Sequence, residues 1–146
     1  KVIFRTMKYY RYILMTLLFC VAIGAEAKRI QTPHMYIFGF AASFTDSVVY
    51  MTEFLDVQGA WYDTKSKFLL GRDNYSLQLK DHFKEKLQMP DRVCMVFFAK
   101  SMKKAEKKYL KLRKKYLSDK KRTSSYEVRY VTSQEFKFEP IDMSEE

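Results

Sequence analysis

The chain has 146 residues, of which 47% are hydrophobic and 30% charged, and its formal net charge is +10 at pH 7. A chain of this length and apolar content can bury a core of its own, which excludes a largely disordered protein. It contains only two cysteines, Cys20 and Cys94, which excludes a small scaffold held together by internal disulfides.

Residues 1–27 have the pattern of a secretory signal peptide. Met7 precedes a basic, aromatic stretch, apolar residues fill most of 13–24, and 25–27 read Ala-Glu-Ala. These three parts match the n-region, the h-region and a small-x-small cleavage site. We expect the residues before Met7 to lie upstream of the true start. Cleavage after Ala27 would then send the protein to the periplasm or the extracellular space.

This segment has two alternative fates, a retained membrane anchor and lipidation. An uncut membrane anchor is disfavoured because twelve apolar residues span about 18 Å as a helix, against about 30 Å of hydrocarbon. Cys20 could carry a lipid, which would make the protein a lipoprotein. The bulky Phe19 before it fits poorly where signal cleavage favours small residues, so cleavage after Ala27 remains the expectation.

Residues 28–146 predict a single α+β domain. The first two strands would form a hairpin around a turn at 45–47, and two helices and further strands would follow. The expected order is β-β-α-β-α-β-β, in a mixed four- to five-stranded sheet with two helices packed on one face. The strands are expected at 35–44, 48–55, 93–99, 126–131 and 135–139, with short ones near 60–62 and 67–70, and the helices at 75–88 and 101–117.

Local signals support these elements. The unbroken apolar run 93–99 predicts a central strand buried on both faces. Asp73 or Asn74 could cap the first helix and Ser101 the second. The alternating residues 135–139 predict an edge strand, and the acidic tail that follows them is expected to fray.

The clearest functional feature is a cluster of lysines in 100–122. This segment holds twelve basic residues against Glu106 and Asp119, while the rest of the mature chain is slightly acidic. Such a patch attracts anions. The lysines expected to contact a partner are Lys103, Lys104, Lys107, Lys108, Lys111, Lys114 and Lys115.

The partner would be an anionic envelope component, such as lipopolysaccharide or anionic lipid, or an acidic protein. Nucleic acid is disfavoured by the export signal and by the excess of lysine over arginine. The alternative is a solvated outer face of a helix whose narrow apolar seam packs in the core. The expected seam residues are Met102, Ala105, Tyr109, Leu112 and Tyr116.

A second candidate is a ligand rim at the start of the first helix, where backbone N–H groups favour anions. Its residues would be Trp61, Arg72, Asp73 and Tyr75. The alternative is a capping loop with Trp61 in the core.

The sequence carries no HExxH, G-x-S-x-G or phosphate-binding glycine loop, and we expect no cofactor and no metal. Cys94 lies in an apolar run, where a thiol behaves as a small hydrophobe unless His34 or His82 lies beside it. The expected function is a small exported, non-enzymatic binding or accessory protein. The alternative is a small exported enzyme, hydrolase-like, with its site in 61–75. The oligomeric state stays open.

Overall fold

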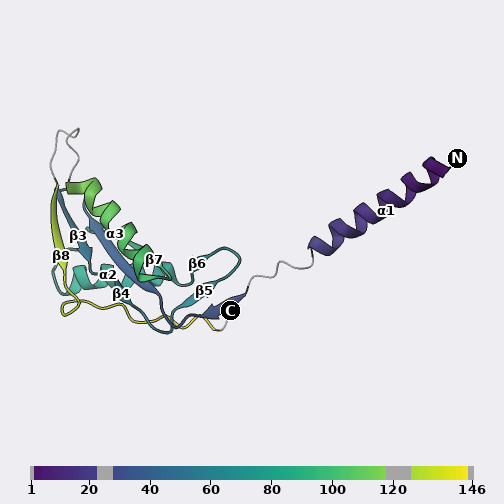
Figure 1. Ribbon diagram of the computed structural model, residues 1–146. Coiled ribbons are helices and arrows are strands. Elements are labelled where there is room, and N and C mark those ends of the chain that lie inside the picture. Colours follow the sequence, from purple (N-terminus) through teal and green to yellow (C-terminus); the bar gives the residue numbers. More distant parts are fainter. Residues whose placement is uncertain (1, 23–27, 118–125, 145–146) are drawn as a thin grey trace.

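The computed structural model describes residues 2–22, 28–117 and 126–144. Figure 1 shows one N-terminal helix, α1, drawn apart from a body formed by the other elements. The expected cleavage site at 25–27 lies outside the described residues. The elements are α1 (Val2–Ala22), β1 (Arg29–Gln31), β2 (Tyr36–Ala42), β3 (Val48–Thr52), β4 (Leu55–Asp56), β5 (Trp61–Asp63), β6 (Phe68–Leu69), α2 (Arg72–Glu85), β7 (Val93–Ala99), α3 (Met102–Leu117) and β8 (Glu127–Val131).

The main sheet is built around β2. Strand β7 pairs antiparallel with β2, with Gly39 opposite Val96. On the other side β2 pairs antiparallel with β3 and β4, and β8 runs parallel to β3. A second, antiparallel sheet has the order β1-β5-β6. The predicted α+β class and mixed sheet are therefore confirmed, and the two short strands belong to the smaller sheet.

The prediction that 93–99 is a central strand is wrong, because β7 pairs with β2 alone among the described strands. Val93 and Met95 are exposed, whereas Val96 and Ala99 are buried. The apolar run arises because both helices contact β7, so even an edge strand loses water from much of both faces. The central strand is β2, in which residues 37–41 are all buried.

The helices cover opposite faces of the sheet, which differs from the expected packing on one face. Successive side chains of a strand point to opposite faces. Ile37 and Ala41 share a buried cluster with α2, through Leu79 and Phe83. Phe38 and Phe40 instead belong to a cluster that α3 covers.

The α2 face is closed by an irregular C-terminal segment, 136–144, where the sequence predicted an edge strand. Phe138 is buried and meets the ring of Tyr75 edge-on at 6.1 Å. The Gln78 side chain accepts a hydrogen bond from Glu139 N and donates one to Glu139 O, both at 2.9 Å. A helix side chain therefore satisfies backbone groups that a strand neighbour would otherwise pair.

The two helices begin differently. Ser101 caps α3 as predicted, accepting a hydrogen bond from Lys104 N at 3.3 Å. Helix α2 begins at Arg72 rather than at residue 75, and its N-cap is Gly71 at φ 73° with no side-chain cap. Glycine adopts this left-handed conformation without steric cost. Asp73 therefore lies in the first turn, where its charge favours the helix dipole.

Candidate functional site

The side chains of α3 divide into a buried seam and an exposed basic face. Ala105 is fully buried, and Tyr109, Leu112 and Tyr116 are half-buried against the sheet. Tyr109 meets Phe38 edge-on at 5.4 Å, and Tyr116 lies 4.9 Å from Phe40. Met102, expected in this seam, is exposed.

All seven predicted contact lysines are exposed. None of them forms an ion pair with an acidic side chain in the part of the chain that the structure describes. The seam faces the sheet, so most of these ammonium groups are directed to solvent as a concentrated positive surface. We call the outer residues Lys103, Lys107, Lys111 and Lys114 the basic face.

Lys108 differs from the basic face because it also contacts the protein. Its Nζ donates to the carbonyl of Phe98 at 2.7 Å, and Arg72 Nε donates to the carbonyl of Val96 at 3.0 Å. These two carbonyls are two residues apart and so leave β7 on the same side. Burial, then the nearby charges of Arg72 and Lys104, lower the pKa of Lys108. Two cations therefore cover the outer edge of β7, which protects it against strand pairing.

The four predicted rim residues have separate environments. Tyr75 is fully buried, and its hydroxyl accepts a hydrogen bond from Ile141 N at 3.1 Å. Burial raises the pKa of Tyr75. The placement of Tyr75 in a rim is therefore wrong: it is a core residue. Asp73 is exposed in the first turn of α2, and Arg72 covers β7.

Trp61 is half-buried and lines a separate hollow of about 370 Å³ with Gly59 and residues of the C-terminal segment. Arg72, Asp73 and Tyr75 do not line this hollow. A hydrolase site in 61–75 therefore stays a prediction, and the four rim side chains do not come together to support it.

A pocket that sequence reasoning missed lies between the end of α2 and the β3–β8 pair. Its volume is about 530 Å³, within the range of small-ligand sites. Its lining residues are Tyr50, His82, Lys86, Leu87, Met89, Arg129, Tyr130, Val131 and Glu135. They come from four separate stretches of the chain, and no local spacing signalled that they would meet.

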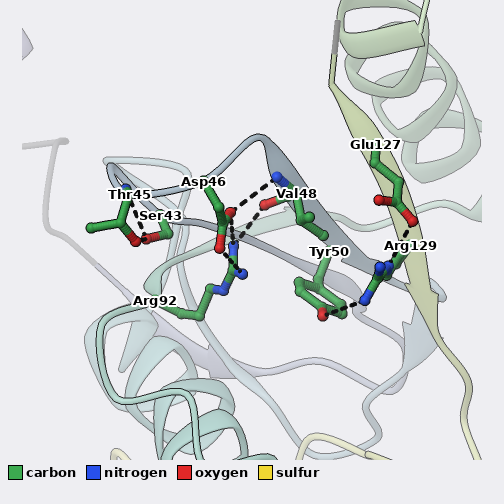
Figure 2. Close-up of polar contacts among 8 residues, drawn as sticks. All are labelled: Ser43, Thr45, Asp46, Val48, Tyr50, Arg92, Glu127 and Arg129. Atoms are coloured by element: carbon green, nitrogen blue, oxygen red, sulfur yellow. Dashed lines mark hydrogen bonds and ion pairs between the residues drawn. The ribbon is translucent and has the colours of Figure 1, made fainter.

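Two side chains of this pocket, Arg129 and Tyr50, are fixed by contacts with other residues. Figure 2 shows Arg129 between Glu127 and Tyr50: Nε donates to Glu127 Oε1 at 2.8 Å and Nη1 to Tyr50 Oη at 3.5 Å. These contacts raise the pKa of Arg129, mainly through the bond to Glu127. Arg92 stacks its guanidinium over the Tyr50 ring at 5.1 Å, which fixes the wall of the pocket.

Arg92 itself is buried and bound on two sides. It donates to both carboxylate oxygens of Asp46, at 3.0 and 2.6 Å, and to the Val48 carbonyl at 2.6 Å (Figure 2). The hydrogen bond from Val48 N and the pair with Arg92 lower the pKa of Asp46. A bidentate pair of this kind ties the β2–β3 turn to the start of β7.

His82 supplies the imidazole of the pocket. Its Nε2 is buried and has no hydrogen-bond partner among the described residues. Burial lowers its pKa, Glu135 opposes that change, and Lys86 adds to it. The pocket thus combines an imidazole that favours its neutral form with a carboxylate, two phenols and two cations, and it can accept a small polar ligand.

Cys94 behaves as the sequence predicted. It is half-buried, its Sγ lies 4.0 Å from the Arg92 carbonyl, and burial raises its pKa to about 11. The charges acting on it are those of Lys80 and Arg92 rather than of a histidine. His34 instead pairs with Asp56 at 2.6 Å. A thiol in this setting is protonated and unreactive at neutral pH.

Residues 2–22, 28–117 and 126–144 contain no group of three or more His, Cys, Asp or Glu side chains placed to hold a metal ion. Within the same ranges, no helix combines the length and apolar character needed to cross a membrane. No protein-family model matches the chain, and searches of curated proteins and of solved structures found no match.

Proposed function

We propose that this is a small exported binding protein whose basic face on α3 contacts an anionic partner. The observation that carries this proposal is the division of α3: the seam is packed against the sheet, while seven lysines are exposed without an acidic partner among the described residues. Like charges held together on one helix repel each other. A surface arranged in this way gains most when an external anion neutralises it.

Export is supported by the three-part pattern of residues 1–27. An exported protein meets the anionic lipids and polysaccharides of a cell envelope. Lysine suits such partners because its ammonium group acts as a point charge without a fixed hydrogen-bonding geometry. The proposal therefore predicts broad affinity for anionic surfaces and a strong dependence on salt.

The test is retention of the purified protein on vesicles that contain phosphatidylglycerol. The test variant replaces the basic face, Lys103→Gln, Lys107→Gln, Lys111→Gln and Lys114→Gln. It leaves Lys108 in place because that side chain bonds to β7. Each lysine near an anionic membrane contributes about 1 kcal/mol, so we expect binding to weaken more than about a hundredfold.

The matched control removes the same charge from the α2 side, with Lys80→Gln, Lys84→Gln, Lys86→Gln and Lys137→Gln, four exposed positions. We expect this variant to bind nearly as well as the parent. Both variants should keep an unfolding free energy within about 0.5 kcal/mol of the parent, as is usual for surface changes. If the two variants lose binding equally, net charge rather than the basic face is responsible, and the proposal fails.

A further inference from the structure

The outer surface of α3 carries two exposed leucines among its lysines. Leu110 is 48% exposed and Leu117 is 51% exposed. They are seven residues apart, so they lie on one side of the helix about 10.5 Å from each other. Neither belongs to the seam, which lies roughly 120° around the helix axis from them at 3.6 residues per turn. Packing within the domain therefore leaves about half of each leucine exposed to water.

Cationic side chains surround these leucines. Lys103, Lys107 and Lys114 occupy the adjoining helical positions, and Leu110, Leu117, Arg113 and Lys114 together line a shallow hollow of about 300 Å³. Arg113 also lies over the ring of Tyr130 on β8, at 5.7 Å, and Tyr130 is 46% exposed. The surface thus combines apolar side chains, an amphipathic ring and a rim of positive charge.

We propose that the anionic partner of the basic face is the surface of a lipid bilayer with phosphate-bearing head groups, and that Leu110 and Leu117 insert below those head groups. This inference rests on the proposed function and names its partner. A lysine surface alone would suit any polyanion. Leucines rimmed by cations gain only where an apolar layer lies directly behind an anionic one.

The geometry is that of a helix lying in the membrane plane. The seam stays packed on the sheet, so the helix does not have to leave the domain to bind. The lysines can extend their methylene stems along the membrane while their ammonium groups remain at the phosphates. Tyr130 has the amphipathic character of residues found at this depth. Membrane contact through one side of α3 therefore needs no spanning segment.

The test compares Leu110→Ser/Leu117→Ser with Leu77→Ser. Leu77 is 52% exposed but lies on α2, which covers the opposite face of the sheet. Binding is measured to phosphatidylcholine vesicles containing phosphatidylglycerol and, separately, to heparin, a soluble polyanion without an apolar layer. We expect the double variant to lose about tenfold or more in vesicle affinity, from burial of the two side chains. Heparin binding should stay unchanged, and Leu77→Ser should change neither.

The outcomes distinguish insertion of the two leucines from attraction of anions by the basic face. If the double variant binds vesicles as the parent does, while the basic-face variant does not, insertion is overturned and the proposed function stands. If the basic-face variant still binds vesicles and heparin, the proposed function itself fails. A thermal unfolding midpoint for the double variant equal to that of Leu77→Ser shows that any loss of binding is not a loss of folding.

Discussion

The two faces of the main sheet are covered in different ways. On one face, α2 and the C-terminal segment enclose a core in which Tyr75, Leu79 and Phe83 are all 0% exposed. On the other, α3 contributes one fully buried residue, Ala105, and its larger seam side chains are half-buried. The α2 face is built for burial, whereas the α3 face leaves its helix largely in contact with solvent.

This difference has an energetic reading. Apolar burial stabilises by about 25 cal/mol per Å², so we expect the larger buried cluster, on the α2 face, to contribute the greater share of the stability. The outer residues of α3 should then tolerate substitution with little loss of stability, since few of them contribute to the core. Under the proposed function, substitutions on the outer surface of α3 should therefore change contact with the partner without unfolding the domain.

The largest expected effect comes from truncating one apolar side chain on each face of the sheet. Phe83→Ala removes a fully buried ring that meets Tyr50 edge-on at 5.0 Å, and it should reduce the free energy of unfolding by about 3–5 kcal/mol. Leu112→Ala removes a half-buried side chain from the α3 face and should cost about 1–2 kcal/mol. Urea unfolding of the two variants and of the parent measures both values.

Leu77→Ala provides the reference for an exposed position and should fall within about 0.5 kcal/mol of the parent. Equal losses for Phe83→Ala and Leu112→Ala would contradict the unequal division of stability between the faces. A loss of vesicle binding by Phe83→Ala, under conditions where that variant is folded, would instead contradict the proposal that α3 alone makes the contact.

Gly39 sharpens the comparison within a single strand. It lies on the α2 face of β2, and a Cβ added there would clash with the Leu79 side chain and come within 3.3 Å of Phe138 Cζ. Gly39→Ala should therefore destabilise by about 1–3 kcal/mol through overpacking, as measured by urea unfolding. Ala41, two residues further along the same face of β2, is fully buried in the same cluster, so this face accepts a methyl group at another position.

A double-mutant cycle with Leu79→Ala separates this clash from other effects. The space left by the leucine can receive the new methyl group, so Gly39→Ala should cost less in that background than alone. Additive losses would show that the glycine matters for strand conformation rather than for contact with α2.

Sequence periodicity predicted most of the elements but not which elements lie beside each other. The apolar run 93–99 forms β7 at the predicted bounds, and Ser101 caps α3 as predicted. The position of β7 within the sheet could not be predicted from its sequence. An edge strand that helices cover on both faces has the same apolar composition as a central strand. Phe136 and Phe138 alternate with polar residues as a strand would, yet the segment is irregular. Phe138 packs against Tyr75, and the Gln78 side chain hydrogen-bonds the backbone of Glu139 in place of a neighbouring strand.

The candidate sites show the same limit. The lysines of α3 were visible in the sequence because a helix places its own residues predictably. Leu110 and Leu117 are within the same stretch, but only the packing of the seam shows that they remain exposed. The pocket around His82 could not be anticipated, since it depends on the end of α2 meeting β8 and the turn at Glu135.

The smallest expected effect concerns His82, where the α2 face meets that pocket. Its pKa is lowered in the folded protein, so the unfolded chain takes up the proton first as pH falls below about 6.5. The free energy of unfolding should therefore decrease between pH 7 and pH 5. Asp46 and Asp63, whose pKa values are also lowered, start from 3.8 and titrate below this window. His82→Asn should flatten the pH dependence, as measured by urea unfolding at several pH values.

A substitution of Glu135 should change the pH dependence in the opposite direction to His82→Asn. The charge of Glu135 raises the pKa of His82 against the effect of burial, so Glu135→Gln should widen the gap between the folded and unfolded pKa values and steepen the loss of stability on acidification. Opposite changes from His82→Asn and Glu135→Gln would show that the pocket couples an imidazole to a carboxylate in the folded protein.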